Sequence, residues 1–547
     1  MKRVLSVLLA AFALSSPAAG RVEFDLVLAN GKVVDGTGAP WFRADVGIRG
    51  DRIAAIGDLS AAKARRRIDL GGRVVAPGFI DMLGSSEGAL LVDNRVESKI
   101  RQGITTEIVG EGRSLAPLND AIVSDFKLFH ERFKVTFDWR DLDGYARRFA
   151  IQRSTINIAT FVSATNVRRL VLGSENVKPT REQLRKMESL VDRAMAQGAI
   201  GLSSALIYPP ATYADREELT ALARVAARHG GLYASHIRSE GHELMAAIDE
   251  AVAIGRDAGI PVEIWHLKAS GQSNWGKMKD VLARIERART EGVDVTANVY
   301  PYTAAANPLT SNIPAWAQDG GRPRMLERLR DPTQRERIKR ELWRTALGDE
   351  AADGIQVIVA EDAVARPFIG KRISDVAREL KRTPEEALLH LVESSEGTIG
   401  VVRYLMNEDD VRLALSRPWI SIGTDAPGQA IDGPFAGESA HPRAFGSMPR
   451  VLGHYAREVR LFPLEEAVRK MTSLPARRVR LFDRGLLRPG MFADIAVFDP
   501  DRVRDLATYE APTRYPEGIE YVIVNGKIVL DGGTMTSERP GRFLRRR

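Results

Sequence analysis

Two histidines of this chain stand where they could share one metal ion. The segment Leu232–Ser235 reads as a strand and is followed directly by His236, and Val262–Trp265 is followed in the same way by His266. Neutral imidazole is a good ligand for zinc and similar divalent ions. A single histidine at a strand end is more often packed or hydrogen-bonded, but a pair from consecutive predicted strands favours a metal site.

Two carboxylates can join this pair. Asp425 follows the predicted strand Trp419–Ile422, and Glu111 lies between Gly110 and Gly112, where the backbone can approach closely. Glu111, His236 and His266 would give three ligands and leave a position open, as a hydrolytic metal site requires. An acid flanked by glycines is often only a turn former, so Glu111 alone carries little weight.

The middle of the chain alternates short apolar runs with amphipathic helices. The predicted strands are 156–159, 201–203, 232–234, 262–265, 293–297, 356–358 and 419–422, and helices are predicted over 181–197, 214–229, 241–258 and 275–291. This alternation over about 400 residues predicts an α/β fold with a parallel sheet, and a (β/α)₈ barrel leads over a doubly wound sheet. Because catalytic residues of such barrels lie at the carboxyl ends of strands, the residues named above are the ones to examine.

Both ends of the mature chain predict β structure of similar character. Residues 24–75 alternate apolar and polar positions, with a hairpin turn expected at Asn30-Gly31 and a second turn at Gly50-Asp51. Segments 493–499 and 521–529 have the same pattern near the carboxyl end. We therefore expect one small β domain assembled from both termini.

Composition and the first residues limit the class of protein. The chain of 547 residues is 44% hydrophobic and 27% charged, which is typical of a globular protein, and its net charge of +8 has no nucleic-acid-binding motif beside it. Residues 1–20 have the three-part layout of a secretory signal peptide, so we expect a periplasmic or secreted protein without stable membrane insertion after cleavage. The chain has no cysteine, so a metal must be held by His, Asp, Glu or a modified Lys.

Ordered motifs along nearly the whole mature chain resemble the amidohydrolase superfamily, and within it the D-aminoacylase (N-acyl-D-amino-acid deacylase) family. They are Val75–Asp81, Gln102–Thr106, Gly201–Pro210, Ser235–Arg238, His266–Lys268, Tyr300–Tyr302, Gly423–Asp425, His441–Gly446, Met471–Ala476 and Arg484–Gly490. Beyond the predicted signal peptide (1–20), the resemblance implies a (β/α)₈ barrel over 77–478 and a small β-sandwich formed by 21–76 and 479–547. It also implies an insertion near 304–350 that covers the active site as a lid.

The sequence departs from the family pattern at two places. The first barrel strand of the superfamily ends in Asp-x-His-x-His, whereas this chain has Leu83 and Ser85 at the two histidine positions after Asp81. A cysteine of the family's metal site is replaced, with Glu111 as the matching residue in a loop one residue shorter. The sequence therefore predicts one divalent ion in place of two. Zinc is expected first, with manganese or cobalt as alternatives.

The resemblance also implies roles for the residues around the metal. Hydrolysis would use a metal-activated water, with Asp425 moving its proton to the leaving nitrogen and Tyr208 polarising the scissile carbonyl. Lys268, Tyr300 and Arg443 would hold the carboxylate of the substrate, although an ordinary salt bridge is the alternative role for the charged pair. Tyr302 and Ser85 are lesser candidates, and His441 is expected to shape the loop before Arg443.

The substrate implied is a small N-acyl-D-amino acid or a related acylated dipeptide, cleaved at its linear amide bond. Two other functions fit parts of the sequence. A cyclic-amide hydrolase of the dihydroorotase or hydantoinase kind would share the fold, but such enzymes normally use the Asp-x-His-x-His motif that is missing here. A catalytically inactive periplasmic binding protein would explain Leu83 and Ser85 but not the retention of His236, His266 and Asp425. The sequence is compatible with a homo-oligomer.

Overall fold

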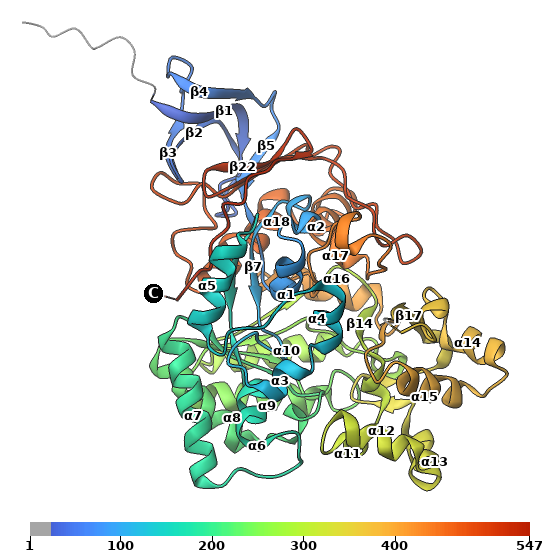
Figure 1. The fold of residues 1–547 in the computed structure, drawn as a ribbon. Helices are drawn as coiled ribbons and strands as arrows, with labels where there is room; N and C mark the ends of the chain where they lie inside the picture. Colours follow the sequence, from blue (N-terminus) through green and yellow to red (C-terminus); the bar gives the residue numbers. More distant parts are fainter. Residues whose placement is uncertain (1–22, 361, 547) are drawn as a thin grey trace, which may run out of the picture.

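The computed structural model of the protein describes residues 23–360 and 362–546, and the predicted signal peptide lies outside this range. Within the described residues, no helix has both the length and the apolar character needed to span a membrane. Figure 1 shows a β-rich region at one end of the molecule, a large central body, and a lobe of helices at one side.

Strands from both ends of the chain form one nine-stranded sheet. Its order is β23-β22-β21-β20-β5-β1-β2-β3, and β4 pairs with β1. The first carboxyl-terminal strand pairs antiparallel with the last amino-terminal one, with Ile495 opposite Pro77 and Phe498 opposite Val74. The strands are β1 (Phe24–Val33), β2 (Phe42–Arg49), β3 (Arg52–Gly57), β4 (Ala64–Asp69), β5 (Val74–Pro77), β20 (Ile495–Phe498), β21 (Ile519–Val524), β22 (Lys527–Asp531) and β23 (Thr534–Met535).

The predicted hairpin at Asn30-Gly31 is wrong. β1 continues through these residues, and its register with β2 shifts between Leu28 and Gly31, so the left-handed Asn30 (φ 59°) marks a β-bulge. A Cβ on Gly31 would lie 2.6 Å from a Val75 methyl carbon, so close packing also requires glycine there. The turn predicted at Gly50-Asp51 does join the antiparallel strands β2 and β3.

Parallel strands form the centre of the molecule. One sheet has the order β19-β13-β12-β11-β10-β9 and another has the order β6-β7-β8. A backbone hydrogen bond of 3.1 Å from Met82 N to Ile422 O connects the segments that follow β6 and end β19. The strands are β6 (Phe79–Asp81), β7 (Ile104–Val109), β8 (Asn157–Thr160), β9 (Val162–Ser163), β10 (Gly201–Ala205), β11 (Leu232–His236), β12 (Val262–Ile264), β13 (Val295–Val299) and β19 (Ile420–Ile422).

Amphipathic helices alternate with these strands, which confirms the mixed α/β class. Thr180 and Gln183 form a capping box at the start of α7, and Asp215 caps α8 by accepting from Glu218 N at 3.0 Å. The helices are α1 (Ser86–Val92), α2 (Glu97–Ile100), α3 (Asp120–Ser124), α4 (Lys127–Phe133), α5 (Leu142–Gln152), α6 (Ala164–Leu172), α7 (Arg181–Ala196), α8 (Arg216–Arg228), α9 (Leu244–Ala258), α10 (Met278–Thr290), α16 (Glu408–Leu415), α17 (Arg443–Arg450), α18 (Leu464–Met471) and α19 (Ser473–Arg478).

A second hydrophobic core occupies the segment between β13 and β19. It extends from Leu309 to Val401, so it includes most of the predicted lid segment and continues beyond it. The segment predicted as a central strand at 356–358 lies here instead, in β17, which pairs antiparallel with β18. Its helices form the lobe in Figure 1. The elements are β14 (Ala305–Pro308), α11 (Ala315–Gln318), α12 (Arg322–Arg330), α13 (Pro332–Glu341), β15 (Arg344–Thr345), β16 (Gly348–Asp349), β17 (Ile355–Val359), α14 (Ile373–Leu380), α15 (Pro384–Ser394) and β18 (Gly400–Arg403).

One carboxyl group in the first turn of α1 makes stability depend on pH. Burial, with Glu107 and Glu111 nearby, raises the pKa of Glu87 to about 8, and its Oε2 has no hydrogen-bond partner among the described residues. When folding raises the pKa of a carboxyl group, the group does not change the free energy of unfolding at a pH below its pKa in the unfolded chain. Above that pH it lowers the free energy of unfolding, increasingly so until the pH reaches its pKa in the folded protein. We expect Glu87→Gln to stabilise the protein by about 1–3 kcal/mol at pH 8 and by little at pH 5. Urea unfolding at the two pH values measures this, and equal stability of both proteins at pH 8 would contradict it.

Candidate functional site

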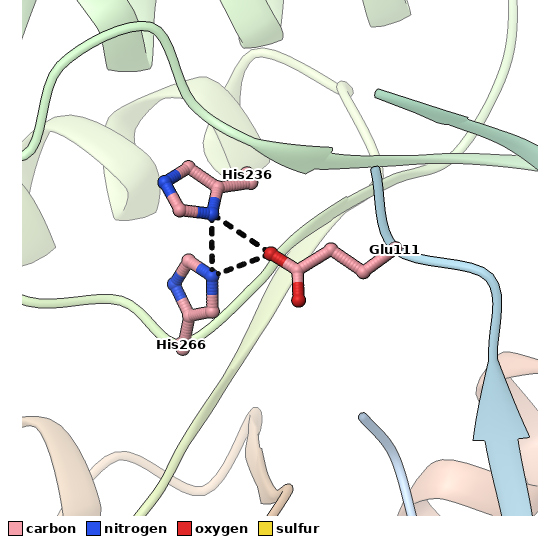
Figure 2. A group of neighbouring side chains, drawn as sticks. All are labelled: Glu111, His236 and His266. Carbon is pink, nitrogen blue, oxygen red and sulfur yellow. Dashed lines mark hydrogen bonds and ion pairs between the residues drawn. The ribbon is translucent and has the colours of Figure 1, made fainter. Parts of the chain in front are cut away.

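The predicted ligands Glu111, His236 and His266 come together at the carboxyl ends of the parallel strands. Glu111 Oε1 lies 2.8 Å from His236 Nδ1 and 2.8 Å from His266 Nε2, and the two nitrogens are 2.9 Å apart. Figure 2 shows the three side chains pointing at one another from three separate backbone segments. In the described part of the chain, they are the one group of at least three His, Asp or Glu residues whose ligand atoms all lie within 4.8 Å of one another.

Unusual backbone conformations at the ends of the strands direct these side chains into the site. Gly110 has φ 103°, and a Cβ there would lie 3.0 Å from Phe161 O, so glycine lets the chain turn sharply out of β7 into Glu111. His266 has φ 37° and Asp425 has φ 49°, values that non-glycine residues rarely adopt. Asn298 stabilises the turn at His266 by accepting from its backbone N–H at 2.9 Å. Left-handed residues of this kind concentrate at functional sites, where surrounding contacts hold the strain.

The donor set fits a divalent cation. One carboxylate oxygen and two imidazole nitrogens are the ligands that zinc accepts in catalytic sites, which keep a further position open. Burial opposes the charge of Glu111, but His266 and His236 outweigh it and hold the pKa of Glu111 well below its usual value. Burial and Lys268 oppose protonation of His266, yet Glu111 and Glu240 raise the pKa of His266 to about 9. The potential between these carboxylates therefore favours positive charge.

Glu240 is a residue of the site that the sequence did not single out. It is 2% exposed, and its Oε1 lies 3.0 Å from His266 Nδ1 and 3.7 Å from His236 Nε2. These are the ring nitrogens that do not contact Glu111. Glu240 is within hydrogen-bond distance of His266, whereas His236 Nε2 has no hydrogen-bond partner among the described residues. Such a carboxylate fixes the tautomer and ring orientation of metal ligands. The spacing of four residues between His236 and Glu240 was the available signal.

Glu240 also changes the interpretation of Lys268. Lys268 Nζ forms a buried ion pair with Glu240 and lies 2.8 Å from His266 Nδ1. Burial opposes the charge on Glu240, but Lys268 and the two histidines lower the pKa of Glu240. Lys268 lines the cavity as expected, but its ammonium group already has a carboxylate partner.

Arg443 lies against Asp425 and Tyr300. Its Nη1 is 2.8 Å from Asp425 Oδ2, and its guanidinium group stacks 4.6 Å from the centre of the Tyr300 ring. Arg443 is 3% exposed, and its Nε makes no hydrogen bond with the described residues. Burial raises the pKa of Asp425, and Arg443 opposes that rise. The site thus holds a buried guanidinium group with a donor to spare.

Leu83 and Ser85, which occupy the positions of the two family histidines after Asp81, do not offer a side chain that binds a metal. Leu83 packs in an apolar cluster with Ile108 and Trp265, whereas Ser85 is exposed. Asp81, the retained acid, receives hydrogen bonds from Lys99 Nζ at 2.7 Å and from Thr424 N at 2.8 Å. Lys99 is fully buried, so its ammonium group is the counter-ion of this carboxylate.

Glu111, His236, His266 and Asp425 line a cavity of about 430 Å³. Tyr208, Lys268 and Tyr300 are also in its wall. The Tyr208 ring lies 5.3 Å from that of His236, and burial raises the pKa of Tyr208 well above its usual value, so its hydroxyl group remains a proton donor. Tyr302 instead lies beside His441, which accepts from Arg443 N at 3.0 Å within the loop.

Metal content tests the ligand set. We expect Glu111→Ala and His266→Ala to lose bound zinc during dialysis, because each removes one of three ligands. Glu111→Cys should retain it, since a thiolate is also a zinc ligand. Mass spectrometry of the dialysed proteins gives the stoichiometry. Full zinc retention by Glu111→Ala would show that the ion is held elsewhere.

Zinc affinity tests the shared carboxylate. The double variant Glu240→Gln/Lys268→Met removes both charges of the buried pair together, and we expect it to bind zinc roughly 10- to 100-fold more weakly because His266 loses its carboxylate partner. Competition with a chromogenic chelator measures the affinity. Glu243→Gln, an exposed glutamate three residues away, is the matched control. Unchanged affinity in the double variant would exclude this role for Glu240.

Comparisons with known proteins agree with this geometry. Residues 66–530 match the model of the Amidohydrolase family. The N-acyl-D-glutamate deacylase of Alcaligenes xylosoxydans xylosoxydans is 38% identical over 537 residues, covering 96% of this chain and 97% of that protein. A solved D-aminoacylase, described with a binuclear metal centre that shows one-metal activation and second-metal attenuation, has a TM-score of 0.81 at 36% identity and covers 96% of this chain and 100% of its own. The N-acyl-D-glutamate deacylase of Bordetella bronchiseptica, solved with zinc and a phosphonate mimic of the tetrahedral intermediate, has a TM-score of 0.80 at 35% identity, with coverage of 95% and 99%. The chain belongs to the amidohydrolase family.

Proposed function

We propose that this protein is a metal-dependent hydrolase that cleaves the amide bond of N-acyl-D-amino acids or related acylated dipeptides. The observation that carries the proposal is the convergence of Glu111, His236 and His266 in the wall of a cavity that also contains Asp425. Relatives of similar length at 35–38% identity are D-aminoacylases and N-acyl-D-glutamate deacylases. A cavity of about 430 Å³ suits a small acylated amino acid.

The proposed cofactor is one divalent ion, with zinc expected first and manganese or cobalt as alternatives. Glu111, His236 and His266 would hold it. When bound, the ion lowers the pKa of a water ligand and polarises the carbonyl group of the substrate. Leu83 and the Lys99–Asp81 ion pair support a single ion, because an apolar side chain and an ammonium group replace ligands near the second position.

Asp425 is the proposed proton carrier. It accepts a proton from the attacking water as the new carbon–oxygen bond forms, and it donates that proton to the nitrogen as the carbon–nitrogen bond breaks. Burial raises the pKa of Asp425 toward the range in which a carboxyl group can both accept and donate, and Arg443 keeps it ionised for the first step. Tyr208 donates a hydrogen bond to the oxygen on which negative charge develops.

Arg443 and Tyr300 are the proposed anchors of the substrate carboxylate. The Nε of Arg443 is a buried donor without a hydrogen-bond partner among the described residues, and a carboxylate would satisfy it. Lys268 contributes positive charge from its pair with Glu240, 5.5 Å from the Tyr300 ring. Its second effect is to hold Glu240 in place behind the histidines.

The two alternative functions agree less well with the residues of the site. A cyclic-amide hydrolase would require the pair of metals for which Leu83 and Ser85 provide no ligands. An inactive binding protein would have no need for the histidine pair to be oriented by Glu240 while Asp425 is held in a left-handed conformation next to it.

We also propose the domain organisation and the location of the protein that the sequence predicts. Parallel strands in the order β6-β7-β8 and β9-β10-β11-β12-β13-β19 support a closed (β/α)₈ barrel over 77–478, in which β8 and β9, separated by Phe161 alone, count as one strand. The shared terminal sheet supports a β-sandwich of 21–76 and 479–547, and the segment near 304–350 supports a lid. Residues 1–20 as a signal peptide would place the enzyme in the periplasm or outside the cell.

A substrate screen tests the proposal. We expect the zinc-loaded protein to release free amine from N-acetyl-D-amino acids and not from their L enantiomers. Asp425→Asn should lower kcat by about 10²- to 10⁴-fold because it removes the proton carrier. Asp432→Asn, a matched change at an exposed acid that pairs with Arg95, should leave kcat unchanged. An absence of turnover across the D series with zinc, manganese and cobalt would refute the proposed activity.

A further inference from the structure

One residue of the neighbouring strand holds the backbone at the proposed metal ligand His266. Asn298, in β13, accepts a hydrogen bond from His266 N through its side-chain Oδ1 at 2.9 Å, and another from Leu267 N through its main-chain oxygen at 2.9 Å. Asn298 is fully buried. A Cβ on Gly423, two residues before Asp425, would lie 3.2 Å from Asn298 Oδ1. Asn298 therefore lies between the backbone turns of His266 and Asp425.

A buried carboxylate orients the side-chain amide of Asn298. Asn298 Nδ2 donates to Glu263 Oε1 at 3.2 Å, and Thr296 Oγ1 donates to Glu263 Oε2. Glu263 is fully buried in β12. Because an ionised carboxylate only accepts hydrogen bonds, it determines that the nitrogen end of the Asn298 amide faces it. The oxygen end is thereby directed at His266 N.

An arginine at the amino ends of the strands balances the charge of Glu263. Arg478 Nε lies 3.3 Å from Glu263 Oε2, and Arg478 Nη2 donates to the main-chain oxygen of Val262, the first residue of β12. Arg478 is the last residue of α19. Since a buried carboxylate without a cation beside it would be strongly destabilising, this ion pair lets Glu263 remain charged. The contacts form a continuous polar chain from α19 through Glu263 and Asn298 to His266.

The conformation of His266 gives this polar chain a task. A non-glycine residue with φ 37° is strained, and such a conformation persists only where surrounding contacts impose it. The position of the imidazole ring depends on this turn, and metal ligands must be held close to their binding geometry. Asn298 binds the amide of the strained residue and the amide that follows it, so it acts at the point where the turn is made.

We propose that Asn298 and Glu263 are positioning residues of the metal site, which hold the backbone of His266 in the conformation that brings its ring to Glu111 and His236. The inference rests on the proposed function, in which His266 is a metal ligand. Neither Asn298 nor Glu263 supplies a ligand atom, and both act through His266. Their loss therefore weakens metal binding while the three ligands stay present.

Exchanging the donor and the acceptor tests this chain. Asn298→Leu has a side chain of similar shape that cannot accept from His266 N, and we expect it to bind zinc roughly 10-fold more weakly. In Asn298→Asp/Glu263→Gln the new amide at position 263 can donate to the new carboxylate at position 298, which still accepts from His266 N. The number of charges is unchanged, so zinc affinity should recover most of the way. Competition with a chromogenic chelator measures all three proteins.

Asn312→Leu is the matched control. Asn312 is also a buried asparagine, but it lies in the lobe, where its amide bonds Glu350 and Arg403. This change should lower stability and leave zinc affinity as it is. Asn298→Ala removes the same two hydrogen bonds and replaces the leucine variant if that protein does not fold.

The outcomes separate the positioning role from the proposed metal site. Zinc binding by a folded Asn298→Leu or Asn298→Ala protein that is as tight as in the unmodified protein would overturn the positioning role alone. A lack of recovery in the exchanged variant would do the same, because the effect would then not pass through these hydrogen bonds. Absence of zinc binding by the unmodified protein would overturn the proposed metal site and the positioning role together.

Discussion

The arrangement of the site depends on two histidines held between two carboxylates. Glu111 contacts His236 Nδ1 and His266 Nε2, and Glu240 faces the opposite nitrogens of the same rings. The carboxylate contact at Nδ1 orients the His266 ring so that its Nε2 faces the point where the ligand atoms converge. Two carboxylates on opposite sides of the same histidines repel each other without positive charge nearby. Lys268 supplies part of it beside Glu240, and a divalent ion beside Glu111 would supply the rest.

The fold supports this arrangement at a distance. The parallel strands bring β7, β11, β12 and β19 to one edge, where Glu111, His236, His266 and Asp425 follow them. The lobe between β13 and β19 has its own core, and its contacts with the segment after α6 carry Arg322 to the cavity wall. The central strands thus determine the reacting end of the cavity, and the lobe determines which groups surround the rest of the substrate.

The sequence predicted the class of fold and the convergence of Glu111, His236 and His266, because strand ends and glycine-flanked turns are local signals. Asn30-Gly31 misled because the same dipeptide serves a bulge as well as a hairpin, and only its pairing with β2 distinguishes the two. The strand at 356–358 was real but belongs to another sheet, which is a property of long-range pairing. Glu240 was missed because its spacing of four residues from His236 does not by itself show that it contacts His266 and Lys268, which follow the next strand.

The central claim is that one ion is held by a carboxylate and two imidazoles without a second metal beside it. X-ray absorption spectroscopy of the zinc-loaded protein tests this most directly, because it reports both the ligand atoms and any neighbouring metal. The account predicts a nitrogen and oxygen shell at about 2.0–2.1 Å, with imidazole scattering from two histidines and no zinc–zinc contribution. A zinc–zinc contribution at about 3.5–4 Å, accompanied by two bound equivalents, would contradict it.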